Sequence, residues 1–107
     1  MERIILVYAT FSSMVEAERT SHQMVERRLA ASVNILPRVL SYSWQEGTVE
    51  RGEEIIAVFK TRMAVAETLR TEIRNTHSSS TPPIFLVSID EADSGYQAWI
   101  VEETTTS

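Results

Sequence analysis

The 107-residue sequence contains no cysteine. Disulfides and thiolate metal sites are therefore excluded, although the absence of cysteine says little about the compartment. No apolar run approaches the roughly 20 residues that cross a bilayer, and the opening MERIILVYAT lacks the apolar core and cleavage site of a secretory signal. We therefore expect a cytoplasmic protein without a membrane partner.

Positive charge is also scarce. Ten Lys and Arg stand against 15 Asp and Glu, a net charge of -5, so no basic face is expected for nucleic acid. The sequence has no Gly-rich phosphate loop, no G-x-S-x-G and no H-E-x-x-H, and we predict no enzyme activity. Its 43% hydrophobic and 23% charged residues are typical of one globular domain, which we place at residues 1–107.

A long hairpin organises the middle of the chain. Alternating aromatic and polar residues lead into Glu46-Gly47, which predicts a tight turn because Gly accepts positive φ. After a second expected break at Arg51-Gly52, the return strand begins. Its Ile55–Phe59 segment is apolar throughout, which is typical of a strand buried on both faces.

Hydrophobic periodicity predicts the other elements. The expected strands are 4–9, a long strand that starts at 31–36 and enters the hairpin at 41–45, 55–59 and 84–89. The expected helices run from 13 to about 29, from 61 to about 75, and over 96–103. The order β-α-β-β-α-β plus a terminal helix predicts a ferredoxin-like α+β fold. In that fold the sheet is antiparallel, and both crossover helices cover the same face.

Local signals mark where these elements begin and end. Ser13 and Glu16 have the spacing of a capping box, with Glu16 on the outward side of the helix, and Thr61 and Ser94 are candidate caps of the later helices. Pro37 predicts a bend or an edge position in its strand.

The predicted fold leaves one face of the sheet without helices, although three strands are apolar on both faces. Such a patch is larger than soluble monomers usually expose, and at about 25 cal/mol per Å² its burial is strongly favourable. We therefore expect other copies of the chain to cover it. The alternative is that the short terminal helix covers this face alone.

Five stretches together point to a known family. They are Val25–Ile35, Trp44–Gly47, Lys60-Thr61, His77 with Pro82, and Tyr96 with Trp99. In this order and spacing the chain resembles the CutA (divalent-cation tolerance) proteins. The resemblance implies a homotrimer similar in architecture to the nitrogen-regulatory PII proteins, with the hairpin reaching a neighbouring subunit.

The same resemblance implies a response to divalent metals, copper above all. The ligand positions that it implies are occupied here by Ala9, His77 and Pro83, of which only His77 can ligate a metal. Tight transition-metal sites use three or four protein ligands. We therefore predict weak or altered binding of a divalent ion such as copper. The simpler interpretation is that the His77 ring fixes its loop through hydrogen bonds.

Other residues are candidates for a ligand cleft or a subunit interface. Lys60 can bind an anionic ligand or pair with Glu53 or Glu54. Trp44 can stack on a ligand in the same cleft or, with Tyr42, fill a pocket of a neighbouring subunit.

The terminal helix carries a second aromatic pair. Tyr96 and Trp99 share one helix face. We place Tyr96 at the ligand cleft and Trp99 at the subunit interface.

Three alternative functions stay open. One is a PII-like sensor that binds a small anionic ligand at subunit clefts near Lys60 and His77. Another is an acylphosphatase, but that enzyme needs an arginine in the loop after the first strand, and residues 10–13 contain none. The third is a trimeric scaffold for another protein.

Overall fold

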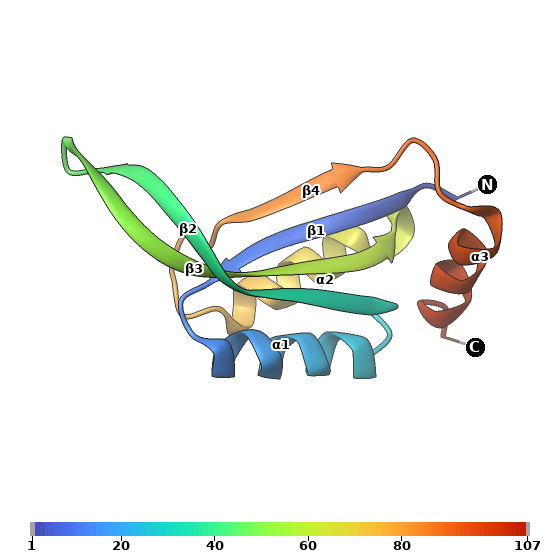
Figure 1. Ribbon diagram of the computed structural model, residues 1–107. Coiled ribbons are helices and arrows are strands. Elements are labelled where there is room, and N and C mark those ends of the chain that lie inside the picture. The colour runs from blue at the N-terminus through green and yellow to red at the C-terminus, as the bar shows by residue number, and fades with distance from the viewer. Residues whose placement is uncertain (1, 107) are drawn as a thin grey trace.

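The computed structural model describes residues 2–106 and contains four strands and three helices. In chain order they are β1 (Ile4–Phe11), α1 (Met14–Glu26), β2 (Ser32–Gln45), β3 (Thr48–Arg62), α2 (Met63–Thr76), β4 (Ile84–Ser88) and α3 (Ser94–Glu103). The sheet has the order β2-β3-β1-β4, and every neighbouring pair is antiparallel. The predicted ferredoxin-like α+β fold is confirmed (Figure 1).

Helices α1 and α2 lie on the same face of the sheet (Figure 1). The main core fills the space between them and the strands because alternate residues of each strand point to this side. It includes Val7, Ala9 and Phe11 from β1, Phe59 from β3, and Leu69 and Ile73 from α2. We call the opposite side of the sheet the open face.

The hairpin of β2 and β3 extends beyond the helices and lengthens the molecule to 47 Å (Figure 1). Its turn is formed by Glu46 at φ 49° and Gly47 at φ 85°, the positive pair that suits a twisted hairpin. The register shifts between Leu36 and Val39, so Pro37 lies at a bulge of an edge strand, as predicted.

Two predictions about β3 are wrong. The strand runs without a break through Arg51-Gly52, because Gly52 pairs with Ser41 within the ladder. Thr61 does not cap α2. It is fully buried in β3, and its hydroxyl donates to the carbonyl of Leu29 at 2.8 Å.

The helix ends also differ in part from the predictions. Ser13 caps α1 as expected, accepting from the Glu16 N–H at 3.2 Å. However, α1 ends at Glu26 rather than near Leu29, because Arg28 takes a left-handed conformation at φ 59°. Asp93 rather than Ser94 is the N-terminal flanking residue of α3.

The open face is only partly covered. Ile100 of α3 packs against Ile4 and Ala31 at one end of it, but Phe85 and Val87 of β4 stay 62% and 45% exposed. The alternative that α3 covers the whole face is therefore wrong for a single chain. The rest of the open face therefore keeps large apolar side chains exposed on the single chain.

Candidate ligand and metal sites

Lys60 and Tyr96 meet at the covered end of the open face. The Lys60 ammonium lies 5.9 Å from the centre of the Tyr96 ring, and Tyr96 stacks on Trp99 with ring centres 5.5 Å apart. The predicted shared face of Tyr96 and Trp99 on α3 is therefore confirmed. Both rings stay partly exposed, at 43% and 39%.

Ser32 joins this pair from the neighbouring strand, because it is the register partner of Lys60. The pKa of the Tyr96 phenol is lowered, first by the Ser32 hydroxyl beside it and then, against the raising effect of burial, by Lys60. The Ser32 oxygen is buried but makes no hydrogen bond of normal geometry within the described residues.

The expected carboxylate partner of Lys60 is not Glu53. Glu53 accepts from two nitrogens of Arg38, at 2.9 and 3.0 Å. Glu54 is the register partner of Val39, several residues along the hairpin from Ser32 and Lys60. The six ion pairs seen among residues 2–106 do not include Lys60.

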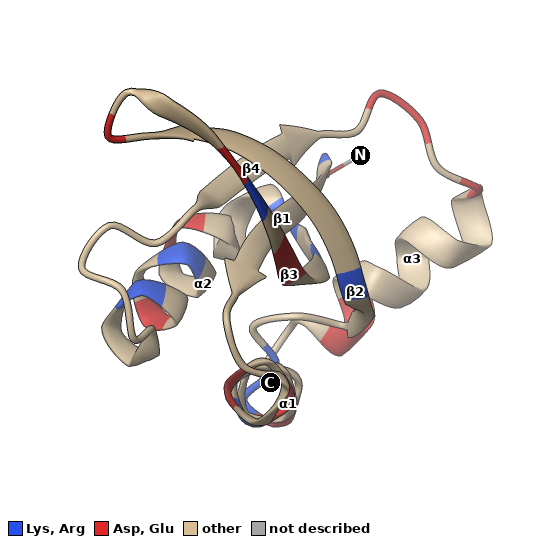
Figure 2. Cartoon of the chain, turned by 60° about the vertical axis from the view of Figure 1, so that its left-hand side comes forward, with Lys and Arg blue, Asp and Glu red and all other residues tan. Residues whose placement is uncertain are grey.

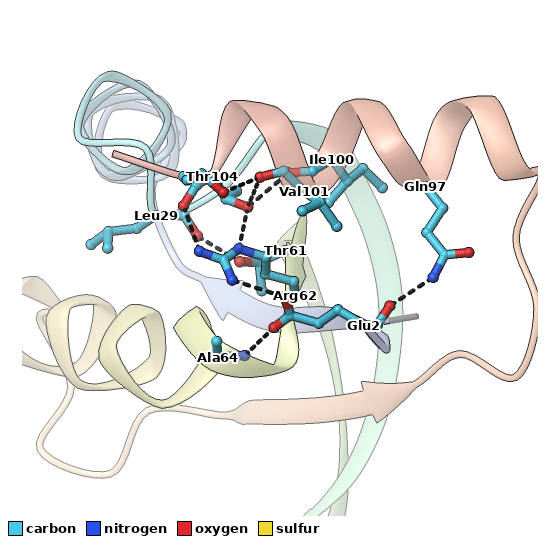
Figure 3. Close-up of polar contacts among 10 residues, drawn as sticks. Glu2, Leu29, Thr61, Arg62, Ala64, Gln97, Ile100, Val101 and Thr104 are labelled. Atoms are coloured by element: carbon cyan, nitrogen blue, oxygen red, sulfur yellow. Dashed lines mark hydrogen bonds and ion pairs between the residues drawn. The ribbon is translucent and has the colours of Figure 1, made fainter. Parts of the chain in front are cut away.

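A network around Arg62 holds α3 over this end of the sheet (Figure 3). Arg62 donates to the Thr104 hydroxyl at 3.0 Å and to the Thr104 carbonyl at 3.2 Å. It also pairs with Glu2 at 2.8 Å, and the second carboxylate oxygen of Glu2 accepts from the Ala64 N–H. Gln97 of α3 donates to the Glu2 carbonyl at 2.6 Å. The position of Tyr96 therefore depends on contacts far from it in sequence.

Trp44 does not reach this group within one chain. It pairs with Val49 near the hairpin turn, on the order of 40 Å along β2 from Ser32. Residues Leu40, Tyr42, Trp44 and Val49 are 54%, 69%, 75% and 57% exposed, and their register and alternation place them on one side of the hairpin. We call these four residues the hairpin patch. A role for Trp44 in the cleft requires a neighbouring copy and stays a prediction.

His77 lies where the loop after α2 meets the end of β1. Its Nε2 is 2.7 Å from the Thr10 carbonyl, and its Nδ1 accepts from the Ser79 N–H at 3.0 Å. The ring also stacks on the buried Phe11 with centres 4.9 Å apart. Nε2 therefore carries the proton and donates, and both ring nitrogens have partners in this loop.

The other two positions that the resemblance implies as ligands are close to His77. Ala9 precedes Thr10 in β1, and the Thr10 N–H donates to the Pro83 carbonyl at 3.1 Å. Neither Ala9 nor Pro83 has a side-chain donor atom. Within residues 2–106 no three His, Asp or Glu side chains come together as a metal site. The residues present therefore do not fit a preformed metal centre.

Sequence reasoning missed the role of Glu16 at this junction. Its side chain is buried, and its carboxylate accepts from the Ser78 N–H at 3.0 Å and the Ser78 hydroxyl at 3.3 Å. The predicted outward orientation is thus wrong. The S-x-x-E spacing marked the helix start correctly, but the partner of the glutamate comes from a loop 62 residues away.

The charge distribution offers no basic face among the described residues. Figure 2 shows Lys and Arg spread over several elements, whereas the loop between β4 and α3 carries Asp90, Glu91 and Asp93. Arg3 pairs with this loop, at 3.6 Å from Asp90. No helix in the described part of the chain is long and apolar enough to cross a bilayer.

Comparisons with known proteins agree with one another. The family model described as CutA1 divalent ion tolerance protein matches residues 5–103. The divalent-cation tolerance protein CutA of Pyrococcus horikoshii is 33% identical over 94% of this chain and 98% of its own length. That of Archaeoglobus fulgidus is 36% identical over 90% and 93%.

Solved structures share the fold. The crystal structure of CutA1 from Oryza sativa superposes with a TM-score of 0.91 at 27% identity, covering 99% of this chain and 97% of that one. The Archaeoglobus fulgidus structure, described as periplasmic, gives 0.89 at 33% identity over 95% and 99%. A rice relative is described as chloroplastic, so relatives occupy different compartments. The family model and the two archaeal relatives are described by tolerance of divalent ions. This chain belongs to the CutA1 family of divalent ion tolerance proteins.

Proposed function

We propose that this protein takes part in the response to divalent metal ions, copper in particular, as a cytoplasmic homotrimer without enzyme activity. Membership of a divalent ion tolerance family supports the first part of the proposal. The proposal includes no nucleic-acid or membrane partner.

The single observation that carries the assembly is the presence of two separate apolar surfaces on one chain. The hairpin patch lies at one end of the molecule, and the exposed residues of the open face, Phe85 and Val87, lie on the sheet itself. Contact between two different surfaces is heterologous, and such contacts either close into a ring or continue as a filament. Three copies, each placing its hairpin on the next, form the closed ring that we propose, with Tyr42, Trp44 and Trp99 in the interfaces.

Metal binding in this proposal is weak. A metal at His77 must displace either the Thr10 or the Ser79 contact of the ring, because the lone pair of Nδ1 is used and Nε2 carries the proton. The neighbouring Ala9 and Pro83 supply no further ligand. One imidazole and water hold a first-row transition ion far less tightly than a site of three or four ligands.

Calorimetric titration with copper tests the metal proposal. We expect weak binding that is the same for the wild type and for His77→Ala. His22→Ala is a matched control, because His22 is exposed on α1 and is the other histidine of the chain. Micromolar or tighter binding that His77→Ala abolishes and His22→Ala preserves would contradict the proposal of weak binding.

A second candidate function is a PII-like sensor that binds a small anionic ligand at the subunit clefts. The observation that favours it is the Lys60 ammonium, which forms no ion pair with the described residues and lies beside Tyr96.

A further inference from the structure

Lys60 stands on the open face near the end that α3 covers. Its register partners are Ser32 on β2 and Leu6 on β1, and the next pair toward the hairpin is Val58 with Tyr8. On its other side, Ile4 packs under Ile100 of α3. An ammonium group therefore lies among largely apolar side chains, on a surface that the proposed assembly covers.

Burial of this face by another copy changes which contacts the Lys60 ammonium needs. A half-buried ammonium still contacts water, whereas a fully buried one needs a charged or strongly polar partner. Residues 2–106 supply no carboxylate within 4.0 Å of it. The Tyr96 ring at 5.9 Å is close to the limit of about 6 Å for cation–π attraction. The partner must therefore come from outside the chain.

A neighbouring hairpin is a poor source of that partner. The side of the hairpin that carries the hairpin patch has one carboxylate along its strands, Glu53, the register partner of Leu40. Both oxygens of Glu53 are already held by Arg38. Glu50 and Glu54 pair with Ser43 and Val39, which places them on the opposite side.

Two more polar groups flank Lys60. The Ser32 oxygen is buried beside the Tyr96 phenol and has no hydrogen bond of normal geometry among residues 2–106, so its donor is unused in the single chain. The Tyr96 phenol lies beside Ser32 and Lys60, and Arg62 and Glu2 hold its helix in place (Figure 3). Two hydroxyls and one ammonium from β2, β3 and α3 thus converge on one spot.

We propose that Lys60, Ser32 and Tyr96 form a subsite for a small oxyanion, a carboxylate or a phosphate, which a neighbouring copy closes. The subsite names the class of ligand that the proposed sensor function binds, and in this respect it rests on that proposal. It depends on the proposed assembly for closure but not on the metal response. The oxyanion neutralises Lys60 and accepts from the two hydroxyls.

Isothermal titration with inorganic phosphate and, separately, with benzoate tests this subsite and separates the two anion classes. We expect saturable binding of at least one of them by the wild type, and no binding of neutral benzamide. Lys60→Met should weaken that binding about tenfold or more, as loss of a charge-assisted hydrogen bond predicts. Arg19→Met is the matched control, because it removes the same charge from the exposed side of α1 and should leave binding unchanged.

Further variants keep the test decisive if Lys60→Met does not fold. Lys60→Arg should retain binding, and Tyr96→Phe and Ser32→Ala should each weaken it several-fold. Light scattering on the same samples reports assembly separately, so loss of the trimer is distinguished from loss of the site. The subsite is disproved if the wild-type trimer binds neither anion. It is equally disproved if Lys60→Met and Arg19→Met bind the anions with the same affinity. The same holds if Lys60→Met breaks the trimer and titration of the wild type shows no anion binding.

Discussion

At the scale of single residues, Glu16 is the one buried acidic side chain among the described residues. It is 7% exposed, and it joins the first turn of α1 to Ser78 in the loop that also holds His77. A buried carboxylate is tolerated when backbone and hydroxyl donors satisfy it. The proximity of the α1 N-terminus also favours negative charge there. Glu16 therefore fixes the loop that carries the one surviving candidate metal ligand.

Replacing Glu16 with alanine should lower the free energy of unfolding by about 1–3 kcal/mol, because it leaves the Ser78 N–H without its acceptor. Chemical denaturation measures the change. Glu18→Ala on the exposed side of the same helix is the control and should stay within about 0.5 kcal/mol of wild type. Equal losses in the two variants would show that the Ser78 contacts contribute nothing specific.

Local sequence patterns predicted the hydrogen-bond and ion-pair partners of single residues least well. Ser13 was recognised as a cap because its partner lies three residues away. Thr61 has the residue type of a cap, but a hydrogen bond to Leu29 holds it inside the sheet. Likewise, the interpretation that Lys60 pairs with Glu53 or Glu54 did not consider Arg38, which lies in the β2 bulge and donates to Glu53. Such partners depend on register, which single-residue signals do not contain.

At the scale of elements, periodicity predicted every helix and strand, and Glu46-Gly47 predicted the turn correctly. Gly52 was taken as a break, yet glycine also fits an extended strand. At Gly52 a Cβ would lie 3.3 Å from the Ser41 hydroxyl, a tight contact that a side chain here would make only if Ser41 shifted by a few tenths of an ångström. The network around Arg62 that holds α3 could not be predicted, because it joins Glu2, Arg62 and Thr104 from three distant segments.

The Glu2 carboxylate in the network around Arg62 predicts that the stability of the protein depends on pH. Burial acts to raise the pKa of Glu2, but the hydrogen bond from the Ala64 N–H and the Arg62 guanidinium outweigh it, and the pKa is lowered from 4.5. A carboxylate with a lowered folded-state pKa stabilises the fold above its unfolded pKa. This contribution is lost as the pH falls through the folded-state value.

Glu2→Gln should therefore destabilise the protein at pH 7, by about 1 kcal/mol, and the difference from wild type should disappear at a pH well below 4.5. Denaturation curves at several pH values measure it. Glu91→Gln in the exposed acidic loop serves as the control and should show little difference at any pH. If Glu2→Gln stayed equally less stable than wild type in strong acid, the charge of Glu2 would not account for the stability that it contributes.

At the scale of the whole molecule, the apolar composition of strands with helices on only one side predicted an uncovered face. The structure has such a face on the single chain, with Phe85 and Val87 exposed on it. It also has the hairpin patch, whose Trp44 is 75% exposed. Which surface meets which depends on copies of the chain, so the sequence of one chain predicts the need for a partner but not the geometry of the contact.

Light scattering of the purified protein at micromolar concentration tests the central claim most directly. The proposed ring predicts a mass about three times that of the 12.1 kDa chain, because the hairpin patch and the open face of each copy are buried against neighbours. A well-folded species with the mass of one chain would contradict the assembly.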